Sequence, residues 1–155
     1  IKLKDILTPR SVVYAIEKNT LLKDIIEDKR TFKFSRVPVY DGHIDNIVGI
    51  ILTKKIFKEA LKNNDTNLED IMKPVFSLNE NIHVAKALNM FIKKKDHMFI
   101  VHDSYNQTEG IVTLEDCIET LLGLEIMDEL DTTADMRKLA LNKMKAKRKE
   151  KEKNN

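Results

Sequence analysis

Apolar residues follow two periods along this chain, one typical of strands and one typical of amphipathic helices. Four short runs are rich in β-branched or aromatic residues and end at turn-forming residues, which predicts strands at 36–40, 47–52, 98–102 and 109–112. Apolar residues at helical spacing follow two candidate N-caps, Thr20 and Asn81. Further helices are predicted at 54–62 and 114–122, and extended segments at 11–16 and 75–78.

These elements occur twice in the same order, β-α-β-β-α. Three blocks recur with them: LKDILTP and LEDIMKP, VPVYD and FIVHD, VGII and EGIV, at offsets of 65, 62 and 61 residues. Three matches in the same order indicate an internal repeat. One such unit is too small to bury both faces of its sheet, so we expect an α+β fold in which two units pack about a pseudo-twofold axis.

The repeat sets the predicted domain organisation. Residues 1–62 form the first repeat, 63–67 a polar linker, 68–131 the second repeat and 132–155 a basic tail that is helical or disordered. The tail has nine Lys or Arg and two Glu between positions 137 and 153, a net charge of +7 that leaves the remainder at −5, because the whole chain carries +2. We favour a disordered, solvated tail. The alternatives are a contact with an anionic membrane surface or with nucleic acid.

Composition limits the remaining possibilities. The 155 residues are 42% hydrophobic and 34% charged, which is typical of a globular protein with a charged surface. Cys117 is the single cysteine, so an internal disulfide and a cysteine-based zinc site are excluded and a reducing compartment is favoured. No apolar run approaches the roughly 20 residues that span a membrane. Since the chain begins with Ile1, we expect it to come from a longer polypeptide.

A family resemblance rests on the block GIVTLED at 110–116. It resembles the glycine-apolar-apolar-threonine-x-x-aspartate signature of CBS repeats (the cystathionine-β-synthase motif), and two repeats in tandem resemble the CBS pair, or Bateman module. The blocks LTPR, SRVPVY, HMFIV and GLEIMDELD resemble the CorC/hemolysin-C-like branch, which is related to the cyclin-M divalent-cation transport proteins. The resemblance covers residues 3–131.

The resemblance implies a regulatory role without catalysis. Such pairs bind AMP, ADP or ATP, in some cases with Mg²⁺, form homodimers, and lie on the cytoplasmic face of the inner or plasma membrane. There they follow a transmembrane magnesium or cobalt transport domain of the same polypeptide. We also find no glycine-rich phosphate loop and no nucleophile beside a base, so nothing in the sequence supports an enzyme.

Thr113 and Asp116 are the first candidate nucleotide-binding residues. A carboxylate accepts hydrogen bonds from both hydroxyls of a ribose, and the helix that begins here offers N–H groups to phosphate. The spacing alone also fits a helix capping box, which needs no ligand. The resemblance favours the binding site, and both roles can hold together.

The remaining candidates are weaker. In the first repeat Lys55 replaces the aspartate, and because lysine accepts no hydrogen bond, one nucleotide site per chain is expected. Lys54 suits either phosphate or solvent. Arg10 and Arg36 suit either phosphates or surface ion pairs. Tyr40, like Phe99 and Tyr105, suits either an adenine or the core.

No metal site is predicted. The acidic residues Glu125, Asp128, Glu129 and Asp131 suit Mg²⁺ or, more simply, a solvated turn. The four histidines lack the spacing of metal ligands.

Three functions remain open. A nucleotide-sensing regulatory module comes first, a structural homodimerisation module without ligand second, and an adaptor that binds nucleic acid through its basic tail third.

Overall fold

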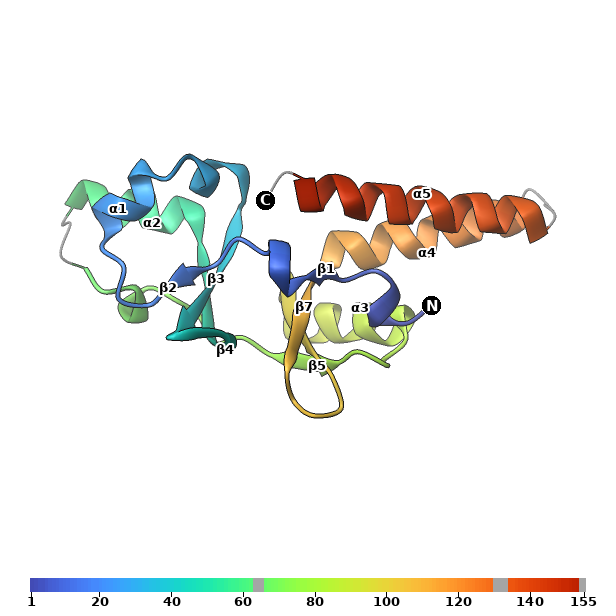
Figure 1. The fold of residues 1–155 in the computed structure, drawn as a ribbon, viewed down its shortest axis with the longest axis horizontal. Helices are drawn as coiled ribbons and strands as arrows, with labels where there is room; N and C mark the ends of the chain where they lie inside the picture. The colour runs from blue at the N-terminus through green and yellow to red at the C-terminus, as the bar shows by residue number, and fades with distance from the viewer. Residues whose placement is uncertain (63–65, 130–133, 154–155) are drawn as a thin grey trace. The chain divides into compact units, whose positions relative to one another are not determined.

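The computed structural model describes residues 1–62, 66–129 and 134–153 (Figure 1). The chain forms two compact units. Unit 1 combines Ile1–Val13 with Ser77–Asn155, and unit 2 is the continuous segment Tyr14–Phe76.

Unit 1 is built on four strands, β1 (Thr8–Pro9), β5 (Ser77–Asn79), β6 (Met98–His102) and β7 (Thr108–Thr113). Their spatial order is β1-β7-β6-β5. β5 and β6 are parallel, because α3 (Val84–Lys94) connects them, whereas β6 pairs with β7 and β7 with β1 in antiparallel fashion. The two later helices are α4 (Leu114–Glu129) and α5 (Ala134–Lys153).

The core of unit 1 lies between the sheet and its helices. Phe91 of α3 stacks on Phe99 of β6 with ring centroids 4.1 Å apart, and both side chains are fully buried. Cys117 of α4 is also fully buried, which confirms its predicted place in the core. Burial, with a smaller effect of the Asp116 charge, raises the pKa of this thiol to about 12. The other members of this core are Leu3, Leu7, Leu78, Val84, Ala87, Val101 and Val112.

Unit 2 has three strands in the order β2 (Ile16–Glu17), β3 (Arg36–Asp41) and β4 (His43–Leu52). β2 and β3 are parallel across α1 (Leu22–Glu27), and β3 and β4 form an antiparallel hairpin that leads into α2 (Thr53–Lys62). The core consists of Tyr14, Ile16, Leu22, Ile25, Val37, Val39, Ile51, Ile56, Leu68 and Ile71.

The predicted β-α-β-β-α order is confirmed in both repeats, with local differences. The segment expected to be extended at 11–16 contains a 3₁₀ helix, η2 (Arg10–Val12), before the short β2. The predicted N-caps are wrong: α1 begins after Leu21 and α3 after His83. At α3 no side chain is needed as a cap, because the amide of Val84 donates to the carbonyl oxygen of Ile1 at 3.0 Å.

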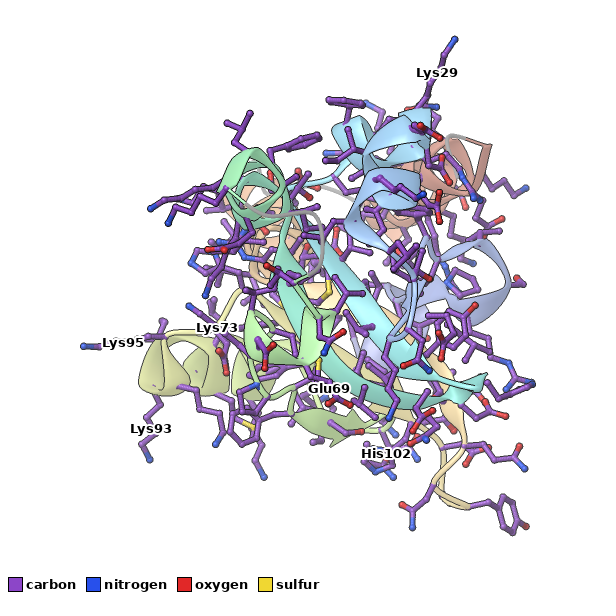
Figure 2. All side chains as sticks on the ribbon, turned by 90° about the vertical axis from the view of Figure 1, so that its left-hand side faces the viewer. Lys29, Glu69, Lys73, Lys93, Lys95 and His102 are labelled. Carbon is purple, nitrogen blue, oxygen red and sulfur yellow. The ribbon has the colours of Figure 1, made fainter. Side chains whose placement is uncertain are left out.

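Helix α3 ends in a left-handed residue. Lys95 has φ 55°, which stops the helix, and its amide donates to the carbonyl oxygen of Ile92 at 3.4 Å. The side chains of Lys93 and Lys95 project away from this end of the helix (Figure 2). Both are exposed cations, which suits the negative end of the helix dipole.

Each unit includes the first segment of the other repeat. Thr8 and Pro9 of the first repeat pair with Ile111 and Gly110 of the second, as Figure 1 shows for β1 beside β7. In unit 2, Lys73 of the second repeat exchanges two backbone hydrogen bonds with Ile50, at 2.8 and 2.9 Å. The compact units therefore differ from the predicted repeats. Residues 1–13 of the first repeat belong to unit 1, and residues 68–76 of the second repeat belong to unit 2.

Two glycines permit this exchange. A Cβ at Gly110 would lie 1.9 Å from the carbonyl oxygen of Thr8, and a Cβ at Gly49 would lie 2.7 Å from the sulfur of Met72. Only a residue without a side chain lets the exchanged segments approach so closely. Gly49 and Gly110, at equivalent positions of the two repeats, thus both allow a segment of the other repeat to pack closely.

The basic tail forms a helix. The favoured expectation of a disordered tail is wrong for residues 134–153, and the helical alternative is confirmed. Figure 1 shows α5 lying along α4. Within the described ranges, no helix is long and apolar enough to cross a membrane. Most of the predicted linker (63–65) and the predicted start of the tail (130–133) lie outside the described residues.

Candidate functional site

The junction between β7 and α4 forms a complete capping box. The backbone N–H of Thr113 donates to Oδ2 of Asp116 at 3.1 Å, and the backbone N–H of Asp116 donates to Oγ1 of Thr113 at 3.2 Å. β7 ends at Thr113 and α4 begins at Leu114, so the two residues lie at the helix N-terminus as the sequence predicts. The cap is present, and it leaves Oδ1 of Asp116 available for another partner.

That second partner is Lys151 of α5. Its Nζ contacts Oδ1 of Asp116, and the aspartate is only 8% exposed. Thr120 adds a hydrogen bond one turn later, from its hydroxyl to the carbonyl oxygen of Asp116 at 2.8 Å. A nearly buried carboxylate is stable only when it is paired, and here one oxygen has the helix cap and the other an ammonium group.

A small pocket lies beside this carboxylate, between α4, α5 and the N-terminal segment. Asp5, Ile6 and Thr120 line it on the side of the sheet and α4. On α5, Arg148 donates from Nη1 to the carbonyl oxygen of Asp5 at 3.5 Å, and its buried Nε has no hydrogen-bond partner among the described residues. The pocket therefore combines a paired carboxylate with an incompletely satisfied guanidinium.

Arg10 belongs to the same unit but not to the same end of the strand pair. Because Pro9 lies opposite Gly110 and Thr8 opposite Ile111, the antiparallel register places Ile6, not Arg10, across from Thr113. Arg10 follows β1 in η2, beyond Gly110. The structure thus brings Thr113 and Asp116 together and places Arg10 at the opposite end of β1.

The other three predicted residues lie in unit 2. Arg36 is paired with Leu52 at the end of the β3–β4 hairpin, and Lys54 follows in the first turn of α2. Both cations therefore lie at the end of the hairpin where α2 begins. Tyr40 instead pairs with Ile47 towards the other end of β3. Tyr40 is half-buried and Lys54 is exposed.

Unit 2 lacks both polar groups of the cap. Its register aligns Leu52 with Thr113, since Leu52 pairs with Arg36 as Thr113 pairs with Met98, and Lys55 takes the place of Asp116. The sequence analysis identified Lys55 but missed Leu52, although the same alignment to the glycine reveals it. Within the described residues, a polar pair of the Thr113–Asp116 type is therefore found in unit 1 and has no counterpart at the same position of unit 2.

Of the remaining candidates, one lies in the core, one on the surface, and the others outside the described residues. Phe99 is fully buried in the core, and Tyr105 is 86% exposed in the β6–β7 loop. The acidic side chains from 125 to 131 lie outside the described residues. Among the side chains that the structure describes, no group of His, Cys, Asp or Glu is arranged to hold a metal ion.

The tail residues at the site were missed. The basic run predicts charge but not a partner, and Lys147, Arg148 and Lys151 were assigned to a solvated tail. A signal is present in retrospect, because these residues share one helical face while α4 supplies Asp116 and Glu119.

Comparisons with known proteins agree on one family. The CBS-domain family model matches residues 68–123. The chain is 36% identical over 128 residues to UPF0053 protein YugS of Bacillus subtilis, covering 83% of this chain and 30% of the relative. It is 34% identical over 130 residues to a possible hemolysin C of Rickettsia bellii, covering 83% and 43%. The chain thus spans less than half the length of these curated relatives.

Solved structures give the same answer. The CBS domain of the bacterial CNNM/CorC family Mg²⁺ transporter has a TM-score of 0.71 and 34% identity, over 76% of this chain and 73% of that chain. Its complex with ATP has the same TM-score and identity, over 76% and 84%. A CBS-domain pair with bound AMP from Klebsiella pneumoniae, at 21% identity and TM-score 0.69 over 79% and 98%, supports the fold alone. With its two-repeat fold, its GIVTLED junction and these relatives, the chain belongs to the CBS-domain family, in the CorC/hemolysin-C-like branch.

Proposed function

We propose that this chain is a regulatory CBS pair that binds one adenine nucleotide at Thr113 and Asp116. The observation that carries the proposal is the nearly buried carboxylate of Asp116, held at the N-terminus of α4 by the Thr113 cap. A ligand with two adjacent hydroxyls matches a carboxylate whose second oxygen is not used by the cap. The ATP bound to a related CBS domain supports the class of ligand.

The site divides the recognition of a nucleotide between two kinds of group. Asp116 accepts from the ribose hydroxyls, and the first turn of α4 presents the positive end of the helix dipole to phosphate. Arg10, which lies in the same unit, is proposed to act on phosphates, since a guanidinium group pairs with them directly. Arg36, Lys54 and Tyr40 lie in unit 2, and for them a role in nucleotide binding stays a prediction from the sequence. Mg²⁺ is proposed to accompany the nucleotide only if the nucleotide has more than one phosphate.

The relatives support a wider role. We expect the pair to lie on the cytoplasmic side of an inner or plasma membrane and to control a divalent-cation transport domain of the same polypeptide. Control requires that the nucleotide binds one state of the pair more tightly than another. No catalysis is proposed, since we find no nucleophile activated by a base among the described residues of the site.

A second candidate function is a homodimerisation module without ligand. It is favoured by two exposed apolar residues one helical turn apart on α4, Ile118 at 38% and Leu122 at 52% exposure. A self-complementary apolar contact explains their exposure without any nucleotide.

Calorimetric titration with AMP, ADP and ATP, each with and without Mg²⁺, tests the nucleotide proposal. Asp116→Asn is the informative variant, because an amide oxygen retains the cap whereas the amide nitrogen cannot accept from ribose. Asp24→Asn, on the exposed surface of α1, is a control with the same change of charge. We expect saturable binding to the native chain and to Asp24→Asn, and at least tenfold weaker binding to Asp116→Asn. No binding of any nucleotide to the native chain refutes the proposal and leaves the dimerisation module.

A further inference from the structure

Helix α5 contacts the rest of unit 1 through one face. Met144, Arg148 and Lys151 are half-buried at spacings of four and three residues, whereas Lys145 and Lys149 are exposed. The spacing is that of one side of an α-helix. At Met144 the two helices are close, because a Cβ added to Gly123 of α4 would lie 3.2 Å from the Met144 methyl group.

Three polar contacts of this face, among the residues that the structure describes, reach carboxylate or carbonyl oxygens. Lys147 pairs with Glu119 at 2.7 Å, Arg148 donates to the carbonyl oxygen of Asp5, and Lys151 pairs with Asp116. α5 is thus attached to α4 by two ion pairs one turn apart, and one of them uses the carboxylate of the candidate site.

The oxygens of Asp116 can be assigned individually. Oδ2 accepts from the backbone of Thr113, and Oδ1 accepts from Lys151. Each carboxylate oxygen can accept a second hydrogen bond, but only 8% of Asp116 is exposed and the ammonium group of Lys151 lies against Oδ1. A nucleotide must therefore displace the ammonium group of Lys151 before Asp116 can accept from its hydroxyls.

We propose that α5 is an internal competitor, so that docking of the basic helix on α4 and binding of a nucleotide at Asp116 exclude each other. The inference rests on the proposed function and adds its regulation: the signal that the nucleotide sends is the release of α5. Binding then exposes the acidic face of α4 and frees a strongly basic helix.

The opposite arrangement is a lid, in which α5 stays docked and lends its cations to the phosphates. The contacts favour competition, because the ammonium groups of Lys147 and Lys151 are already paired with Glu119 and Asp116. Either lysine would have to leave its carboxylate partner before it could pair with a phosphate. Among the three α5 residues with described contacts, Arg148 has an unpartnered Nε and is the one suited to such a role. The two arrangements predict opposite effects of removing Lys151.

The size of the effect follows from population arithmetic. When α5 covers the site for a fraction of the time, the apparent dissociation constant is the intrinsic one divided by the uncovered fraction. In the Lys151–Asp116 pair the ammonium partner is exposed, and such pairs shift an equilibrium by modest factors, so removing Lys151 should tighten nucleotide binding about three- to tenfold.

The test measures binding of AMP and ATP to the full chain and to two variants. Lys151→Ala removes the ion pair with Asp116, and Lys149→Ala removes the same side chain and charge from the exposed face two residues away. We expect the dissociation constant to fall about three- to tenfold in Lys151→Ala and to stay within about twofold in Lys149→Ala. Hydrogen exchange of the α5 amides should become faster when nucleotide is added to the native chain.

The measured affinities and exchange rates distinguish the competitor from the lid. Equal affinities in the two variants, or weaker binding to Lys151→Ala, would overturn the competitor and leave nucleotide binding itself intact. Slower exchange of α5 with nucleotide would do the same and would favour the lid. Absence of AMP and ATP binding in the native chain and in Lys151→Ala would refute the proposed function and the inference together.

Discussion

Gly110 is the position where the exchanged N-terminal segment comes closest to the sheet of unit 1. In Gly110→Ala the new Cβ would lie 1.9 Å from the carbonyl oxygen of Thr8, and because that atom belongs to the backbone, β1 itself must move. Movement of β1 withdraws Leu3 and Leu7, which are 0% and 4% exposed, from the core. Burial of a leucine side chain contributes about 1.5–3 kcal/mol, so complete detachment would cost about 3–6 kcal/mol.

A loss of that size is large, because a domain of this kind is stable by about 5–15 kcal/mol. The assay is urea unfolding of the full chain followed by circular dichroism, together with hydrogen exchange of the Leu3 and Lys4 amides. These amides donate to Ile82 and Glu80 at 2.9 and 3.0 Å and report on the segment directly. We expect a lower unfolding midpoint and lost protection of both amides.

Gly42→Ala is the matched control. Gly42 has nothing within 4 Å of an added Cβ, but its φ of 78° makes alanine unfavourable by about 1 kcal/mol. If Gly110→Ala unfolds at the same urea concentration as Gly42→Ala and keeps its amide protection, β1 does not approach β7 as described, and the explanation of the glycine is refuted.

Three further predictions concern the cap, the second repeat and the buried thiol. Thr113→Val removes the hydroxyl of the capping box and should lower the free energy of unfolding by about 1 kcal/mol in urea titrations; an unchanged value would contradict the cap. Leu52→Thr combined with Lys55→Asp restores the signature in unit 2 and should raise the calorimetric stoichiometry from one nucleotide to two; a stoichiometry of one would contradict the assignment. The pKa of Cys117 rises from 9.0 to about 12 on folding, so the folded chain keeps its proton more tightly. Its contribution to stability is full below pH 9 and is lost as the pH rises towards 12, and a thiol reagent at pH 8 should label the native chain far more slowly than the unfolded one.

The elements themselves are readable from the sequence because each depends on local order. The β-branched strands and the helices of both repeats follow from periodicity, and the placement of Cys117 in the core follows from its position on the inner face of α4. The Thr113–Asp116 pair follows from spacing. Each of these features is decided by residues within a few positions of each other.

The exchange of segments is not readable in this way. Thr8 pairs with Ile111, and no local pattern distinguishes that pairing from one within the first repeat. The docking of α5 is hidden for a related reason. A run of lysines is compatible with full solvation, and the contact of Lys151 with Asp116 depends on the geometry of a distant helix start. Leu52 shows a third limit. Its equivalence to Thr113 is clear only when the strand registers of the two repeats are compared.

The exchanged segment also determines the order in which the chain can be assembled during synthesis. Unit 2 is continuous, so it can fold once residue 76 has left the ribosome, whereas β1 must wait for β7, about a hundred residues after Thr8. At about 5–20 residues per second, the wait lasts roughly 5–20 seconds. During that time Leu3 and Leu7 have no partner in unit 1, and the segment that carries them is an apolar target for chaperones until β7 has been synthesised.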